Sequence, residues 1–80
     1  MICKVKLVWD KESNSWHTET GDIPGLVLGS ESFDELIEKV CLAAPEMLEL
    51  NLDYHGPVNI IFDAERIEAG LVLQEESALV

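Results

Sequence analysis

The fold is decided by the stretch SESFDELIEKVCLAAPEMLEL, residues 30–50. Ser32 is a candidate N-cap, and Glu35 three residues later completes a capping box. The apolar residues that follow recur at three- and four-residue spacing, which places them on one stripe of a helix. The spacing predicts a helix over residues 32–50, about 30 Å long, with a kink expected at Pro45. The stripe consists of Phe33, Leu36, Ile37, Val40, Ala44, Met47 and Leu48.

Two segments before this helix alternate between apolar and polar residues, which is typical of half-buried strands. Residues 2–9 place Lys4 and Lys6 on one face, and residues 15–20 alternate in the same way. The polar residues between them favour a turn, so the two segments are expected to form a hairpin. The faces expected to be buried carry Cys3, Val5, Leu7 and Trp9 in the first strand and Trp16, Thr18 and Thr20 in the second.

A turn motif, Gly21-Asp22-Ile23-Pro24-Gly25, separates this hairpin from a third short strand expected at residues 26–29. Pro24 fixes its own φ, and Gly25 permits the positive φ that a type II turn requires. Asp22 is expected to stabilise the turn through its own backbone. These three residues are therefore candidates for a local structural site.

The last strand is predicted at residues 58–62, after a loop from Asn51 to Pro57. Residues 63–73 are ambiguous between a strand in cis and an arm exchanged with another subunit, and residues 74–80 are expected to form a flexible acidic tail. The order strand, strand, strand, helix, strand predicts one α+β domain over residues 1–73. We expect a small antiparallel sheet with one long helix on one face.

The charge balance restricts the class of partner. The chain of 80 residues has 16 acidic and 5 basic side chains, a formal net charge of −11. Nucleic acid and anionic membranes are disfavoured because both require basic residues. A basic protein would be attracted and steered, and Glu38, Glu46 and Glu49 on the acidic helix face are the candidate binding residues. The alternative is that the acidic residues only maintain solubility.

Neither metal nor cofactor chemistry is indicated. Cys3 and Cys41 lie far apart in apolar segments, and His17 and His55 have no second ligand at a metal-binding spacing. Two free cysteines fit a reducing compartment. The start of the chain lacks the apolar core of a signal peptide, and no apolar run approaches the length of a membrane span. We expect a cytoplasmic protein.

Several segments together resemble the HicB-like antitoxin family, in its short branch without a DNA-binding domain. They are the early hairpin ending in Trp16, the turn motif with Leu26 and Val27, the helix start at residues 32–40, and the stretch APEMLELN at residues 44–51. The resemblance implies a partial ribonuclease-H-like fold, β-β-β-α-β, without nuclease activity. It also implies binding of a small basic toxin that cleaves mRNA, with the toxin's catalytic surface masked.

Two other interpretations follow from the residues. A single helix covers only one face of a sheet, so the chain is alternatively a self-associating module, a dimer or higher homo-oligomer, that uses the bare face or edge. The carboxylates Asp10, Glu12, Asp22 and Asp63 near strand ends could hold two metals for RNA cleavage. Their simpler interpretation is as solvated turn residues. Trp9, Trp16 and Phe33 are interpreted as core residues, with an interface anchor as the alternative for Trp16.

Overall fold

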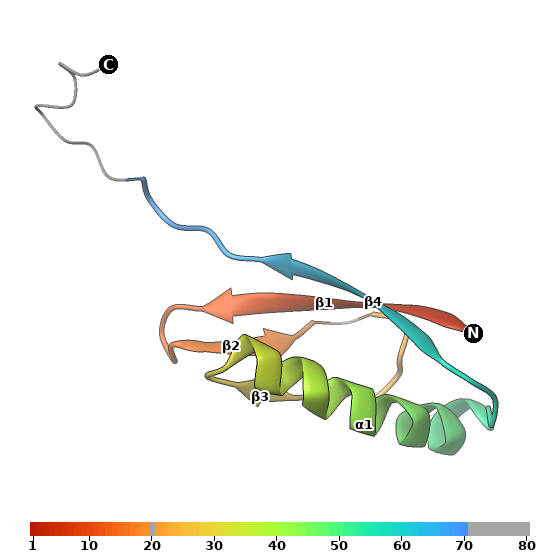
Figure 1. Cartoon of the computed structure of the whole chain (residues 1–80). Coiled ribbons are helices and arrows are strands. Elements are labelled where there is room, and N and C mark those ends of the chain that lie inside the picture. Colours follow the sequence, from red (N-terminus) through yellow and green to blue (C-terminus); the bar gives the residue numbers. More distant parts are fainter. Residues whose placement is uncertain (20, 71–80) are drawn as a thin grey trace, which may run out of the picture.

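A computed structural model describes residues 1–19 and 21–70, which form one helix packed on one face of a four-stranded sheet (Figure 1). The α+β class predicted from the sequence is confirmed. The expectations for Thr20, for residues 71–73 and for the tail at residues 74–80 lie outside the described residues. The elements are β1 (Ile2–Asp10), β2 (Ser15–Thr18), β3 (Gly29–Ser30), α1 (Phe33–Leu52) and β4 (Asn59–Glu65).

The sheet is mixed, which corrects the expectation of an antiparallel one. The strand order is β3-β2-β1-β4. The hairpin pairs β1 with β2 antiparallel, but β1 and β4 are parallel, from Ile2 opposite Asn59 to Val8 opposite Glu65. The cause is α1, which carries the chain back along the sheet between β3 and β4, and a helical crossover of this kind brings the next strand in parallel. Residues 63–65 therefore continue β4 in cis.

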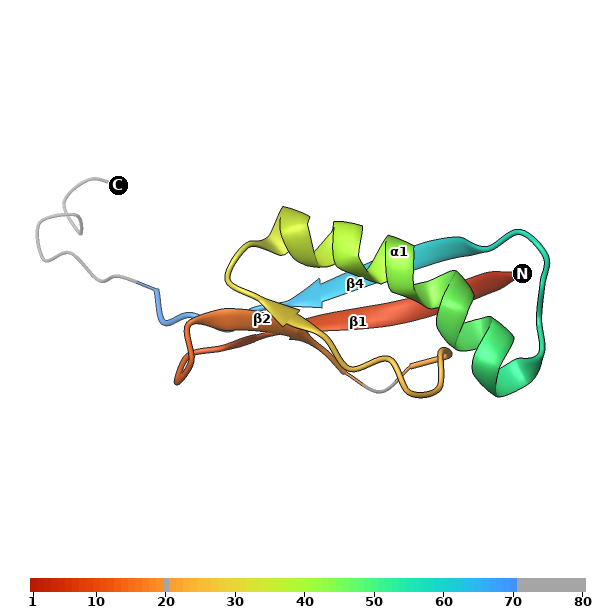
Figure 2. The ribbon, with the colours of Figure 1, turned by 90° about the horizontal axis from the view of Figure 1, so that it is seen from below.

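The core lies between α1 and the inward face of the sheet. Figure 2, which looks onto the helix side, shows α1 running obliquely across the strands. Leu7 of β1 and Leu36 of α1 are both 0% exposed. Each fully buried Leu or Val stabilises the fold by roughly 2 kcal/mol. The buried apolar side chains are Cys3, Val5, Leu7, Ile23, Leu36, Val40, Ala44 and Leu48.

The helix begins and ends close to its predicted bounds. Ser32 is the N-cap, and its Oγ accepts a hydrogen bond from the Glu35 backbone N–H at 3.2 Å. Pro45 lies inside the helix, which continues for two more turns to Leu52. Asp53 closes it in the left-handed conformation, φ 53°, and its backbone N–H bonds back to Glu49 and Leu48. The helix therefore includes Asn51 and Leu52, which the sequence pattern places in the following loop.

The third strand is shorter and later than residues 26–29. Residues 26–28 run beside β2 without regular pairing, because the buried Thr18 hydroxyl takes over part of the ladder. Its Oγ1 accepts from the Leu28 N–H at 3.0 Å and faces the Leu26 and Leu28 carbonyls at 3.2 and 3.4 Å. The Thr18 N–H also donates to the Leu28 carbonyl, at 3.0 Å.

Three aromatic rings close the end of the core near the start of α1. Trp16 lies between Trp9 and Phe33 in edge-to-face contacts, with ring centroids 5.4 and 4.9 Å apart. The Arg66 guanidinium covers Trp9 at 4.0 Å from the ring centroid. Trp16 and Phe33 therefore pack against the core, as the sequence predicts, whereas Trp9 contacts Trp16 without belonging to the residues packed on the core.

We expect Trp16→Ala to lower the free energy of unfolding by about 3 kcal/mol, because both ring contacts are lost and a cavity opens at the end of the core. Trp9→Ala should cost less, since one side of that ring is covered only by Arg66. Denaturant unfolding followed by circular dichroism measures both. An unchanged melting temperature for Trp16→Ala would show that the ring does not belong to the core.

Candidate functional site

The most distinctive surface of the described chain is the outer face of α1, which points away from the sheet. We define the outer helix face as Glu35, Glu38, Leu42, Glu46 and Glu49, residues that follow one another at three- and four-residue spacing opposite the buried stripe. All five are exposed. Leu42 lies at the centre and is 80% exposed. The predicted binding residues Glu38, Glu46 and Glu49 are therefore brought together on one surface.

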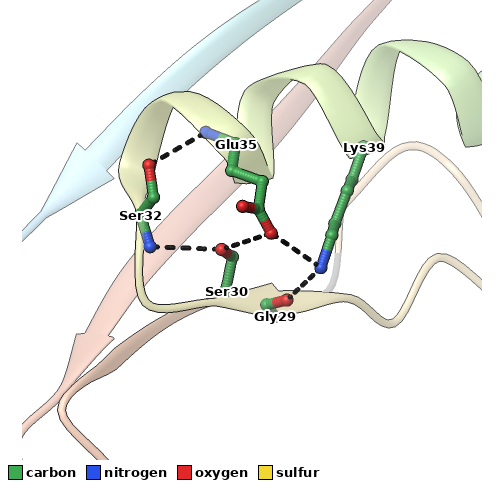
Figure 3. Close-up of polar contacts among 5 residues, drawn as sticks. All are labelled: Gly29, Ser30, Ser32, Glu35 and Lys39. Carbon is green, nitrogen blue, oxygen red and sulfur yellow. Dashed lines mark hydrogen bonds and ion pairs between the residues drawn. The ribbon is translucent and has the colours of Figure 1, made fainter.

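This face is acidic and almost unneutralised. Lys39 is the one cation in α1. Its Nζ lies 3.3 Å from Glu35 Oε1 and donates to the Gly29 carbonyl at 3.2 Å, so it is held at the start of the helix (Figure 3). Among the described residues, no Lys, Arg or His nitrogen comes within 4.0 Å of a carboxylate oxygen of Glu38 or Glu46, while His55 Nδ1 lies 4.0 Å from Glu49.

The position of Glu49 is unfavourable for the helix itself. It occupies the last turn, where the unpaired carbonyls make the negative end of the helix dipole. Asp53 follows as the C-cap, and the last turn contains no basic residue. An acid in the first turn stabilises a helix, whereas an acid in the last turn destabilises it by a few tenths of a kcal/mol. Helix stability therefore does not explain the acidity of this end.

The capping box is only half formed. Two hydrogen bonds through Ser30 replace the missing bond between Glu35 and the Ser32 backbone. The Glu35 carboxylate does not reach the Ser32 backbone. Instead it accepts from Ser30 Oγ at 3.1 Å, and Ser30 Oγ in turn accepts from the Ser32 N–H at 3.1 Å (Figure 3). β3 is thus fastened to the start of α1, which fixes the direction in which the outer helix face points.

The turn motif lies elsewhere and fastens β1. Pro24 and Gly25 form the predicted type II turn, with a Gly25 φ of 79° and a hydrogen bond of 3.4 Å from the Leu26 N–H to the Ile23 carbonyl. The expectation for Asp22 is wrong. Its Oδ2 accepts from the Lys4 N–H at 2.8 Å, and its own N–H donates to the Lys4 carbonyl at 3.3 Å.

Asp22 therefore extends the ladder beyond β2. The strand β2 ends at Thr18, which leaves the backbone of Lys4 without a strand partner on that side. The side chain and amide of Asp22 take that place. A Cβ on Gly21 would lie 2.8 Å from the Lys4 carbonyl oxygen, so only glycine allows this approach.

Asn51 connects the turn motif to α1. Its side-chain amide donates to the Pro24 carbonyl at 3.2 Å and to the Met47 carbonyl at 3.1 Å. No local pattern indicates the contact with Pro24, because it joins residues 27 positions apart. Asp22, Pro24 and Gly25 act as a structural clamp on the hairpin and the helix. They are not brought to the outer helix face.

The four carboxylates considered for metal catalysis do not meet. Asp10 accepts from the Glu12 N–H and the Ser13 hydroxyl, both at 3.0 Å, and these bonds hold the pKa of its carboxyl below the usual value. Asp22 is engaged with β1, and Asp63 lies on β4. Over residues 1–19 and 21–70, no group of three His, Cys, Asp or Glu side chains is placed to hold a metal ion. Nor does this part of the chain contain a helix that could cross a membrane.

A hollow of about 330 Å³ beside the turn motif does not have the side chains of a catalytic site either. It lies between the end of β2 and residues 21–27, and Glu19 is its one charged lining residue among those described. Such a lining has no nucleophile paired with a base. The outer helix face therefore remains the candidate functional site.

Comparison with known proteins gives a family match and supports the fold. Residues 2–74 match the family described as a domain of unknown function, DUF1902. The crystal structure of hypothetical protein TTHA1013 from the extremely thermophilic bacterium Thermus thermophilus is similar, with a TM-score of 0.73 and 32% sequence identity. That similarity covers 88% of this chain and 100% of the other. No curated protein matches the chain.

We expect Asp22→Ala to lower the free energy of unfolding by about 1–2 kcal/mol, because the Lys4 N–H loses a charged acceptor. Asp22→Asn is the matched control, since its amide oxygen can still accept that bond. Thermal unfolding measures both variants. Equal melting temperatures for Asp22→Ala and the unaltered protein would show that the contact does not fasten β1.

Proposed function

We propose that this chain, which belongs to the DUF1902 family, is a non-catalytic protein-binding domain whose outer helix face binds a basic protein. The observation that carries the proposal is the accumulation of exposed carboxylates around the exposed Leu42, including one at the helix end where an acid destabilises the helix. Natural proteins often give up stability at surfaces that serve function. A basic partner supplies the missing positive charge.

The HicB-like resemblance narrows the partner to a small basic toxin that cleaves mRNA. In this interpretation the chain is an antitoxin of the short branch, with a partial ribonuclease-H-like fold, acting in the cytoplasm without binding DNA directly. The observed element order β-β-β-α-β is the one that the resemblance implies. The acidic character of the outer helix face supports it further, because a ribonuclease surface must attract an RNA backbone and is therefore basic.

The chemistry of inhibition follows from electrostatics. A net charge of −11 attracts a basic protein over several ångströms and raises its association rate, and the outer helix face then meets the RNA-binding surface. Leu42 provides an apolar contact at the centre of a polar rim, the arrangement common at protein interfaces. The bound helix would exclude RNA by occupying its site with carboxylates.

We expect the triple variant Glu38→Lys/Glu46→Lys/Glu49→Lys to bind the basic partner about tenfold more slowly at low salt and to show a flatter salt dependence. Its melting temperature should equal or exceed that of the unaltered protein, because all three side chains are exposed and the helix dipole favours a basic side chain at position 49. Stopped-flow association and thermal unfolding provide the two readouts.

A control variant with the same change in net charge distinguishes the effect of the outer helix face from the effect of the total charge. Glu12, Glu31 and Glu68 are exposed and lie outside the outer helix face. Reversing these three to Lys should slow association less than reversing the helix residues. An equal effect from both triple variants would reduce the proposal to general electrostatics, and an unchanged rate for the helix variant would exclude the face.

The nature of the partner is tested in the source genome and in cells. We expect an adjacent reading frame that encodes a basic protein of about 60 residues with one central His. Its expression should arrest growth and degrade mRNA, and co-expression of this chain should restore growth. If no such gene lies nearby and no basic protein binds at low salt, the second candidate function, a self-associating module, is favoured by the bare outer face of the sheet.

A further inference from the structure

The sheet has a second surface, opposite α1, that no other described element covers (Figure 1). We define the outer sheet face as the outward-pointing residues of the inner strand β1 and the adjacent edge strand β4. Register pairs Ile2 with Asn59, Lys4 with Ile61, Lys6 with Asp63 and Val8 with Glu65. Ile2 is 67% exposed and Ile61 46% exposed. From the pattern of charge on this face, we propose that it is the interface of a homodimer.

The face differs from the rest of the molecule in its charge. Two of the 5 basic residues of the chain, Lys4 and Lys6, lie in its β1 row. Asp63 and Glu65 lie in its β4 row, so the two rows carry opposite charges. The outer helix face, in contrast, would repel its own copy. The electrostatic repulsion between two copies is therefore weaker at the outer sheet face than at the outer helix face.

The two rows are also complementary to themselves. Because β1 and β4 are adjacent and parallel, a two-fold axis along the strands lays the β1 row of one copy over the β4 row of the other. Lys6 then faces Asp63 of the second copy, and Asp63 faces its Lys6. Twisted sheets pack at an angle of about 30°, so alignment holds best near the centre, where these residues lie. Around them, Ile61 and Val8 become buried.

The open edge of β4 is the weaker alternative. Antiparallel pairing of β4 with a copy about Phe62 would set Asp63 diagonally across from the second Asp63, within about 8 Å. That contact is repulsive, whereas the face-to-face arrangement forms two opposite-charge pairs. The geometry therefore favours stacked sheets over an extended one.

Lys6 has in-chain partners that keep it in place. Its Nζ lies 3.5 Å from Glu65 and 3.8 Å from Glu19. Lys4 comes within 4.0 Å of no carboxylate oxygen among the described residues. The face thus presents one oriented and one available ammonium group. A surface of two strands is small for a specific interface, so we expect dissociation constants in the micromolar range, about 10–100 µM.

The dependence on salt distinguishes association through this interface from binding at the outer helix face. Two copies with a net charge of −11 repel each other at long range, and salt near 0.15 M screens charges beyond about 8 Å. Dimer formation should strengthen between about 20 mM and 150 mM salt, because the repulsion is screened more than the close pairs. Binding of a basic protein should weaken over the same range. The inference specifies the surface of the self-associating alternative and does not depend on the binding of a basic protein.

Sedimentation of the full chain from about 10 µM to 1 mM tests the proposal. We expect Lys6→Glu alone and Asp63→Lys alone to weaken the dimer about tenfold or more, because each homodimer then faces like charges. Mixing the two variants should restore association. In the mixed dimer the acid introduced at position 6 of one chain meets the base introduced at position 63 of the other, and the remaining Asp63 meets Lys6. Only contacts between chains can produce this recovery.

Two variants that replace an apolar side chain by Ser, and so leave the net charge unchanged, keep the test valid if a reversed charge prevents folding. Ile61→Ser should weaken the dimer several-fold, whereas Leu42→Ser, on the outer helix face, should leave it unchanged. Leu42→Ser should weaken binding of a basic protein, and Ile61→Ser should not. A monomer at 1 mM, a mixture that fails to recover, or a dimer insensitive to Ile61→Ser would overturn the interface.

Discussion

The structure depends on the contact between the apolar stripe of α1 and the inward face of β1. Leu7 and Leu36 are fully buried, and Val5 and Val40 lie beside them. A chain of this size has a thin core, so losing one of these contacts removes a large share of its stability. Both proposed interactions use surfaces that this single contact leaves uncovered.

Because one helix covers one face, the molecule has two unlike surfaces. The outer helix face carries carboxylates around Leu42, and the outer sheet face carries rows of opposite charge on β1 and β4. The first suits a basic partner and the second suits a copy of the same chain. The two lie on opposite sides, so both can be occupied at once. A dimer of this kind would present two acidic helices facing outward.

Much of the architecture could be predicted from local signals. The helix followed from its apolar spacing and from Ser32, the hairpin from alternation, and the type II turn from Pro24 and Gly25. Contacts between distant residues could not be predicted. Asp22 was expected to bond its own turn but completes the ladder of β1 at Lys4, and Asn51 binds Pro24. Their partners lie 18 and 27 positions away, beyond the reach of any local pattern.

The sequence by itself determined the class of the fold, the acidity of one helix face and the polarity of each strand, because these follow from periodicity within a single element. Only the tertiary structure decided that β4 runs parallel to β1, since strand direction depends on where the helical crossover returns the chain. That choice placed Asp63 beside Lys6. The charge pattern of the outer sheet face therefore exists only in the folded molecule, although its residues are plain in the sequence.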